Sequence, residues 1–500
     1  MVAVSTAASG HAIISSQAVR SGRPAYRPSF SYVSVNEPLG AALPQGRAFE
    51  FKTPTRPQIV VSDGRLAQIG LFGTVLVGLL ISIAATHTNT LLPQSLQPLG
   101  ATAYAPLAGP FRFIGFHLAT GEAMAALVVM FACYVVATRY AHLVSARAAI
   151  GAIVALNLFV LLAPPMFSQD VFSYEAYAKM FAIYGVNPYL AGPHTIALDP
   201  VYQFIGAKWW STPSAYGPVF TALSGVLAHA SITVSTYIFK LTAALACLGT
   251  VAIVWRGARL RGVDPVRGAV LFGLNPLVVL YGVGGGHNDL LMVLPMVAGV
   301  YAALRSQDRK AGAMIVTAGA IKLTGLLVAP FAWAAPEMAN GDGRRRAMLV
   351  GAGISTAAVM AVGFGFFGTG TLHLPMILSQ IQSEGDWHSI PGFISSAMLL
   401  PNVAKVVSVI LTVAFVACSA RLLWRVWRGH IDWLEGAAWA TVAILVCAGS
   451  LLPWYVAWLL PLVALCDRPR LVRASMWLTA AMLLITILGY FPNGSALFQF

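Results

Sequence analysis

Long apolar runs, separated by short groups of basic residues, most limit what this chain can fold into. A bilayer with a hydrocarbon core of about 30 Å needs about 20 apolar residues for each helix that crosses it. About thirteen runs reach or approach that length, at residues 66–87, 113–138, 148–165, 217–232, 236–255, 268–284, 288–304, 311–335, 347–367, 402–424, 434–449, 451–466 and 472–491. Only 10% of the 500 residues are charged, whereas an average soluble domain carries about 25%. The sequence therefore excludes a soluble enzyme and predicts an all-α polytopic membrane protein of about 12–13 transmembrane or re-entrant helices.

The net charge of +14 is concentrated in basic groups that lie between these runs. They occupy residues 139–147, 256–267, 305–310, 344–346, 421–428 and 468–473. Lys and Arg resist translocation, so such groups mark the cytoplasmic loops of a membrane protein. We therefore interpret the positive charge as a signal of orientation in a lipid bilayer, and we expect no nucleic-acid partner.

Residues 1–65 differ from the rest in being rich in Ser, Ala, Pro and Arg, and they lack the apolar segment of a signal peptide. They are predicted to form a disordered, basic cytoplasmic tail. A multi-helix transmembrane domain is predicted to follow over residues 66–495. We expect a multi-pass protein of the bacterial inner (plasma) membrane.

The side on which each loop lies follows from the alternation of helices, starting from the cytoplasmic tail. The basic groups remain cytoplasmic only if two conditions hold. One segment within 216–255 must be short, re-entrant or broken, and the segment 311–335 must enter and leave the membrane on the same side. Lys322 and Pro330 inside that second segment indicate two half-helices, which are tolerated where they line a cavity within the protein. The segments then predicted to face outward are the loops 166–215 and 368–400 and the turn 284–289.

The loop 166–215 is too long to be a simple connector, since loops beyond about 12–15 residues are usually functional or disordered. Its many Tyr, Phe and Trp residues predict helices that lie in the membrane interface. Asp170 comes directly after an apolar run that ends in Pro164 and Pro165, which places its carboxylate at the outer membrane surface. A carboxylate fixed there can accept a proton as a general base, although Asp is also a common N-cap of a helix.

Three glycines and three polar residues form the turn 284–289, which ends in His287, Asn288 and Asp289. Glycines allow a ligand to approach the backbone closely, and the free N–H groups at the start of the following helix suit a phosphate. The alternative is a tight turn between helices, capped by Asn288 or Asp289.

Lys322 lies in the middle of an apolar run, where a charge is costly and suggests a functional role. Beside a broken helix it could hold a lipid-linked phosphate. The alternative is that its long side chain snorkels to the membrane surface. Lys240 has a similar setting, and there we expect snorkelling.

The loop 368–400 holds Glu384, Asp386 and His388, together with amides and a tryptophan. Carboxylates, amides and an aromatic side chain are the groups that bind sugars, but exposed loops use the same residues for solvation. The five cysteines are scattered, and neither a compact acidic cluster nor a dinucleotide-binding glycine motif is present. No cofactor is therefore required, and dependence on a divalent metal stays open.

Several motifs occur in order between residues 169 and 289. They read Q-D-V-F-S-Y at 169–174, Y-G-V-N-P-Y at 184–189, A-Y-G-P at 215–218, N-P-L at 275–277 and G-G-H-N-D at 285–289. This ordered set resembles the integral-membrane glycosyltransferases of the C superfamily. It is most similar to the polyprenol-phosphomannose-dependent alpha-1,6-mannosyltransferases.

The resemblance implies transfer of a hexose, mannose by similarity, from a polyprenyl-phosphate donor to a lipid-linked glycan or glycolipid acceptor on the outer face. Asp170 would be the catalytic base of an inverting reaction, and His287 and Lys322 would stabilise the donor phosphate. The residues expected to contact the sugar or the acceptor are Asn288, Asp289, Tyr174, Tyr177, Asn187, Tyr189, Glu384, Asp386 and His388. A multi-pass transporter or flippase for a lipid-linked or small polar substrate is the alternative.

Overall fold

The computed structural model describes residues 62–99, 105–338, 343–384, 388–396 and 398–489. The chain divides into two units, Met1–Ile59 and Val60–Phe500, and every described residue belongs to the second. Most of the predicted tail therefore lies outside the described residues, and the first helix begins at Asp63.

Helices and short helical turns make up the secondary structure of the described residues, which contain no strand. The α-helices are α1 (Asp63–Ala84), α3 (Thr120–Arg139), α4 (Ala146–Leu162), α5 (Asp170–Ala182), α6 (Pro218–Ser224), α7 (Ile232–Arg261), α8 (Pro265–Gly273), α9 (Asn288–Leu304), α10 (Asp308–Ile321), α11 (Ala329–Ala334), α12 (Arg344–Phe367), α13 (Leu374–Glu384), α14 (Ile390–Ser396), α15 (Pro401–Trp427), α16 (Trp433–Cys447), α17 (Val456–Cys466) and α18 (Pro469–Gly489). The short turns used below are the π-helix η10 (Leu277–Val283) and the 3-10 helices η11 (Leu323–Val328) and η14 (Pro453–Tyr455).

The prediction of an all-α polytopic membrane protein is confirmed. Within the described part of the chain, six helical stretches are long and apolar enough to cross a membrane. They are α1, α3, α7, the stretch Arg344–Ser383, α15 and α18, and the pair α8 and η10, bent by 49°, makes a seventh if it counts as one span. The remaining apolar helices are shorter, such as α4, α9 and α16.

The interruption predicted within 311–335 is present in the structure. α10 ends at Ile321, the backbone is extended at Lys322 (φ −150°, ψ 128°), and η11 and α11 follow. A short helix is also found where one was expected within 216–255, because α6 is only seven residues long. Both breaks let polar or cationic side chains lie inside an otherwise apolar bundle.

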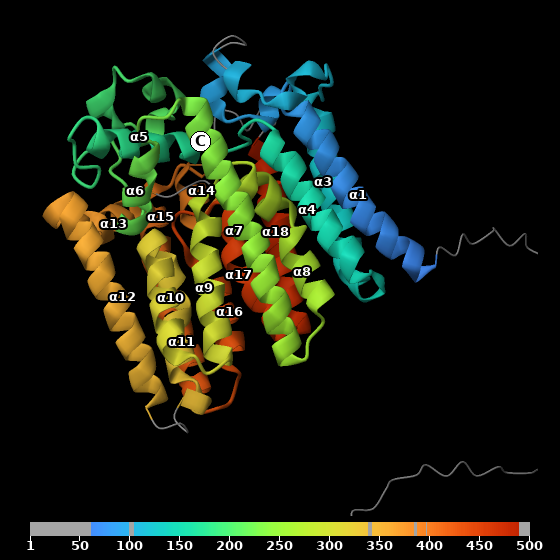
Figure 1. The fold of residues 1–500 in the computed structure, drawn as a ribbon, viewed down its shortest axis with the longest axis vertical. Helices are drawn as coiled ribbons and strands as arrows, with labels where there is room; N and C mark the ends of the chain where they lie inside the picture. The colour runs from blue at the N-terminus through green and yellow to red at the C-terminus, as the bar shows by residue number, and fades with distance from the viewer. Residues whose placement is uncertain (1–61, 100–104, 339–342, 385–387, 397, 490–500) are drawn as a thin grey trace, which may run out of the picture. The chain divides into compact units, whose positions relative to one another are not determined.

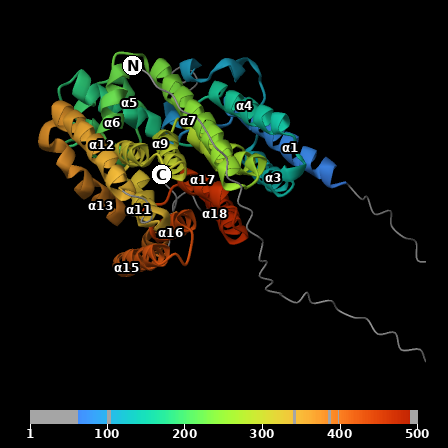
Figure 2. The ribbon, with the colours of Figure 1, turned by 60° about the horizontal axis from the view of Figure 1, so that its bottom comes forward.

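Helices of the two long loops gather at one end of the transmembrane bundle. Figure 1 shows α5, α6 and α13 at the same end as the start of α9. We call this end the Asp170 end, after the first residue of α5, and the other end the opposite end. Figure 2 shows the same bundle with α12 and α15 set apart from α1 and α3.

The core of the bundle lies around α17, which contacts α7, α8, α9, α16 and α18. Every residue from Val456 to Cys466 is buried. α17 is therefore an internal helix that carries aromatic side chains from η14 and its own first turns into the centre of the protein.

Candidate active site

Asp170 is the first residue of α5, and its carboxylate points at the turn that precedes α9. Oδ2 of Asp170 lies 3.4 Å from Nδ1 of His287, and the hydroxyl of Tyr216 donates to the same oxygen at 3.5 Å. The N-cap position of α5 is occupied by Gln169, without a side-chain capping bond. The Asp170 side chain is 16% exposed, whereas that of His287 is fully buried. The carboxylate is therefore the member of this pair that a substrate can reach.

The electrostatic surroundings of Asp170 favour its ionised form. Burial alone would raise the pKa of this carboxyl, but the contact with His287 and the positive charge of Lys322 outweigh burial and hold the pKa below its usual range. Asp170 is therefore a carboxylate at neutral pH and is free to accept a proton.

His287 is held in place by packing rather than by hydrogen bonds. Its ring stacks on Trp454, with centroids 3.8 Å apart and planes at 24°. Neither ring nitrogen makes a well-aligned hydrogen bond within the described residues, so the approach to Asp170 is an ion-pair contact when the imidazole is protonated. Gly286 has φ +65°, a conformation that favours glycine. A Cβ at Gly285 would lie 2.9 Å from the His287 ring, so this glycine allows the close packing around His287.

Asp289 and Lys322 form a buried ion pair next to the Asp170–His287 pair. Nζ of Lys322 lies 2.8 and 2.9 Å from the two carboxylate oxygens, and Nε1 of Trp458 donates to Oδ1 at 2.7 Å. The Lys322 ammonium also lies 4.5 Å from the ring centre of Tyr455. Asp289 is 1% and Lys322 13% exposed. Lys322 therefore does not snorkel, and Asp289 balances its charge.

Tyr174, Tyr177 and Asn288 connect α5 to the neighbouring segments. The Tyr174 hydroxyl donates to Oδ1 of Asn288 at 3.3 Å and accepts from its backbone N–H at 3.4 Å. The Tyr177 hydroxyl donates to the backbone carbonyl of Thr212 at 2.8 Å. Both tyrosine rings lie edge-on to Tyr216. The aromatic cluster thus fixes the position of α5 relative to the start of α9.

The contacts of Asn187 and Tyr189 connect the loop 166–215 to α6 and α12. Nδ2 of Asn187 donates to the Phe367 carbonyl at 2.7 Å. The Tyr189 hydroxyl donates to the carbonyl of Tyr216 at 2.8 Å, and its oxygen lies 3.0 Å from the hydroxyl of Thr221. The structure therefore places these two residues in the scaffold behind Tyr216, and their predicted contact with a substrate stays a prediction.

The structure describes only part of the predicted site in the loop 368–400. Glu384 is the last residue of α13, Asp386 lies outside the described residues, and His388 is a buried side chain. The segment does approach the core, because the Gln382 side chain accepts from the backbone N–H groups of Gly449 and Ser450, just before η14. Sugar binding by Glu384, Asp386 and His388 stays a prediction.

Four residues of the site were missed or given little weight from the sequence: Tyr216, Trp454, Tyr455 and Trp458. Each contacts one of the predicted polar residues. Aromatic residues within an apolar run look the same as core residues. The sequence signals were the A-Y-G-P motif for Tyr216 and, for the other three, the cluster of three aromatics within five residues at the start of the run 451–466.

The expected snorkelling of Lys240 is wrong. Its side chain is fully buried within α7, and its ammonium donates to the backbone carbonyls of Ala163 and Pro164. These carbonyls belong to the end of the run that leads to Asp170. Lys240 therefore stabilises the backbone segment that leads to Asp170.

Metal ligands are not grouped in the part of the chain that the structure describes, where no three His, Cys, Asp or Glu side chains lie close enough to hold one ion. The polar groups of the site are instead two pairs, Asp170 with His287 and Asp289 with Lys322. Such an arrangement offers one accessible base beside one cation, and it can carry out proton abstraction next to a developing negative charge.

Comparisons with known proteins give matches over most of the described chain. The family model described as "Alpha-(1->6)-mannopyranosyltransferase, N-terminal domain" matches residues 67–337, and that of glycosyltransferase family 87 matches residues 215–488. These matches confirm the resemblance predicted from the motifs. No solved structure matches the chain.

Three curated relatives are each 28% identical to this chain. Alpha-(1->6)-mannopyranosyltransferase B of Corynebacterium glutamicum aligns over 62% of this chain and 57% of its own length. Alpha-(1->6)-mannopyranosyltransferase A of Mycobacterium tuberculosis aligns over 67% and 68%, respectively. A probable alpha-(1->6)-mannopyranosyltransferase of Mycolicibacterium smegmatis aligns over 68% and 69%. The chain thus spans less than two thirds of the first of these relatives.

Proposed function

This chain belongs to the alpha-(1->6)-mannopyranosyltransferase family and to glycosyltransferase family 87, and from that premise we propose that it transfers mannose from a polyprenyl-phosphate donor to a glycan or glycolipid acceptor. The observation that carries the proposal is the position of Asp170. It is an ionised, partly exposed carboxylate at the mouth of the bundle, held against His287 and near the Lys322 cation.

In the proposed reaction, Asp170 acts as the general base. A hydroxyl of the acceptor gives its proton to the carboxylate while its oxygen attacks the anomeric carbon of the donor sugar. The bond from that carbon to the phosphate oxygen breaks, and polyprenyl phosphate leaves with the electron pair, so the anomeric configuration inverts. A positioned general base contributes about 10²–10⁴-fold to a rate.

Stabilisation of the departing phosphate is assigned to Lys322 and His287. Lys322 is already paired with Asp289, and the Trp458 N–H holds that carboxylate. Because the ammonium of the 13% exposed Lys322 is already part of an ion pair, a phosphate that approaches it would share this ammonium with Asp289. His287, fixed between Trp454 and Asp170, is the group next to the base that can carry a second positive charge. Groups aimed at a developing charge in a dry site lower the barrier most effectively.

Contacts with the sugar or the acceptor are assigned to the rim of the site. Tyr174 and Asn288 hydrogen-bond each other beside His287, and the loop that carries Glu384 and His388 packs next to η14 through Gln382.

We place the active site on the outer side of a bacterial inner membrane. The supporting observation is that basic residues gather at the last turn of α7 and the first turns of α12 and α18, which lie at the opposite end from α5 (Figure 1). Under the positive-inside rule that end faces the cytoplasm. The test is to compare Ser383→Cys, at the Asp170 end, with Lys310→Cys, at the opposite end, in intact cells. An impermeant thiol reagent should label only Ser383→Cys, and the reverse pattern would invert the orientation.

The reaction itself is tested with purified protein in proteoliposomes, radiolabelled polyprenyl-phosphate mannose and a short mannoside acceptor. Transfer of label to the acceptor supports the proposal. If no transfer occurs with this donor or with other polyprenyl-phosphate sugars, and the labelled lipid instead moves between leaflets, the chain is a transporter or flippase.

A further inference from the structure

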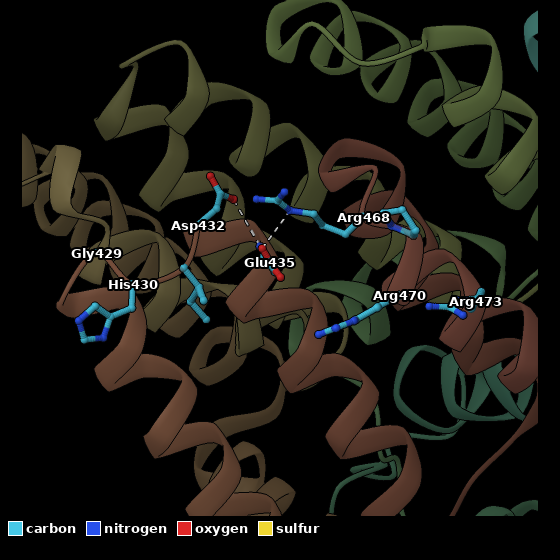
Figure 3. A pocket seen from close by; sticks show the side chains of 9 residues that line it. Gly429, His430, Asp432, Glu435, Arg468, Arg470 and Arg473 are labelled. Atoms are coloured by element: carbon cyan, nitrogen blue, oxygen red, sulfur yellow. Dashed lines mark hydrogen bonds and ion pairs between the residues drawn. The ribbon is translucent and has the colours of Figure 1, made fainter. Parts of the chain in front are cut away.

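A polar pocket lies at the opposite end of the bundle, well away from the proposed active site. It is formed where the α15–α16 connection meets the start of α18, and it has a volume of about 590 Å³. The polar side chains that line it are His430, Asp432, Glu435, Arg468, Arg470 and Arg473. Figure 3 shows the three arginines on one side of the pocket and the two carboxylates on the other.

Both carboxylates of the pocket already have partners. Asp432 accepts from the backbone N–H groups of Leu434 and Glu435 at the start of α16. It also pairs with Arg261 from α7 at 3.1 Å. Glu435 pairs with Arg468 at 3.1 Å. The acidic groups are therefore neutralised by arginines other than Arg470 and Arg473.

Arg470 and Arg473 take no part in these two ion pairs. Both are exposed, and neither has a carboxylate partner among the residues that the structure describes. They lie in the first turns of α18, which has no acidic residue in its first turn. The N-terminus of a helix carries a partial positive charge, so cations there are repelled by the helix as well as by each other. An anion in the pocket would offset both repulsions.

The surroundings of the pocket indicate where such an anion would come from. Trp424 and Trp427, 51% and 48% exposed, lie on the last turn of α15 directly before the pocket. The guanidinium of Arg428 lies 5.7 Å from the ring centre of Trp424. Exposed tryptophans beside arginines are typical of the level at which a helix meets the lipid head groups. The pocket therefore opens at the level of phospholipid phosphates.

We propose that this pocket binds the head group of an anionic phospholipid, with its phosphate held by Arg470 and Arg473. The planar guanidinium groups match the geometry of a phosphate and bind it through pairs of N–H donors. Basic pockets between transmembrane helices on the cytoplasmic side are suited to anionic lipids. The lipid would join the end of α15 to the start of α18, two helices that are not among the principal contacting pairs of the bundle. This inference does not depend on the proposed transferase activity.

The test measures binding of short-chain phosphatidylglycerol to the full-length protein in a neutral detergent. The wild type is compared with the double variant Arg470→Gln/Arg473→Gln. The variant Arg309→Gln/Lys310→Gln is the matched control, because it removes two exposed cations at the same end but outside the pocket. We expect the pocket variant to bind about 30-fold more weakly, because each arginine near lipid contributes about fivefold, and the control to bind like wild type.

Two further measurements distinguish a phospholipid site from a general anion site. Arg470→Lys/Arg473→Lys keeps both charges without the forked donors, and we expect it to recover part of the affinity. Phosphatidylcholine and inorganic phosphate should compete poorly. Equal binding of the Gln double variant and wild type, equal binding of phosphatidylcholine, or equally tight binding of inorganic phosphate would each overturn the proposal.

Discussion

Replacing Lys322 by methionine removes the only cation in contact with Asp289 among the described residues. Comparison with a double variant that removes both charges then shows whether the ion pair serves stability or donor binding. Asp289 is 1% exposed and would keep, within the described part of the chain, only the Trp458 N–H as a partner. Breaking a buried ion pair from one side costs about 3–5 kcal/mol, because it leaves an uncompensated charge. We therefore expect Lys322→Met to lower the unfolding temperature sharply.

The double variant Asp289→Asn/Lys322→Met removes both charges and keeps nearly the same volume. Replacing a complete buried ion pair by neutral groups is often neutral or stabilising, and the new amide can still accept from Trp458. We expect its stability to return to within about 1 kcal/mol of wild type. Thermal unfolding in detergent measures both variants, and Lys208→Met, an exposed lysine at the Asp170 end, is the control.

Donor binding by the same double variant then tests the phosphate contact. If Lys322 holds the donor phosphate, a protein of normal stability should bind polyprenyl-phosphate mannose at least about tenfold more weakly, the loss expected for one charge-assisted contact. A double variant as unstable as Lys322→Met would refute the ion-pair reasoning. A stable double variant with unchanged donor affinity would remove Lys322 from the donor site.

Three further predictions concern residues around the site. Burial raises the pKa of Glu175 to about 7, so the folded protein binds an extra proton between about pH 4.3 and pH 7. The stability that this proton contributes is fully present below that window and is lost as pH rises through 7. The unfolding free energy of wild type relative to Glu175→Gln should therefore fall by roughly 3–4 kcal/mol between the two pH values. A difference that does not change with pH would show that Glu175 has an ordinary pKa. Lys240→Met removes the ammonium that donates to the carbonyls of Ala163 and Pro164 and leaves Ala163 only the weaker contact with the Tyr237 hydroxyl among the described residues, so it should cost about 1–3 kcal/mol in thermal unfolding, whereas unaltered stability would contradict its stabilising role. Tyr174→Phe removes both hydrogen bonds of this hydroxyl with Asn288 and should cost about 1–2 kcal/mol; loss of turnover comparable to removal of the base would instead make this hydroxyl part of the chemistry.

The helices were largely predictable because each needs an apolar surface long enough for a bilayer. The helix boundaries differ from those of the predicted apolar runs where something other than apolar length determines the end of a helix. α7 extends to Arg261, beyond the predicted run 236–255, because basic residues continue a helix as well as apolar ones do. α3 begins only at Thr120, since the preceding residues Pro110–Phe113 form a 3-10 helix.

The members of the candidate site were predictable, but their pairing was not. Asp170, His287, Asn288, Asp289 and Lys322 stand out because polar groups are rare in apolar surroundings. The pairing of Lys322 with Asp289 depends on how α10 packs against α9, which no local pattern encodes.

The error over Lys240 has the same cause. A lysine inside an apolar run snorkels only if its helix end faces lipid, whereas α7 packs against α4 and α9 and turns this side chain inward to two backbone carbonyls. Trp454 was given little weight and Trp458 was missed, because an aromatic residue in a buried helix is most often part of the core. Only the tertiary structure shows that these rings hold His287 and Asp289.

The central claim, that Asp170 is the base, is tested most directly by the rate of mannose transfer from polyprenyl-phosphate mannose. Wild type is compared with Asp170→Asn and with Glu122→Gln, which removes an exposed carboxylate at the start of α3 outside the site. The proposed mechanism predicts that Asp170→Asn binds the donor normally but transfers mannose about 10²–10⁴-fold more slowly, while Glu122→Gln keeps the wild-type rate. Transfer by Asp170→Asn at a rate close to wild type would contradict the mechanism.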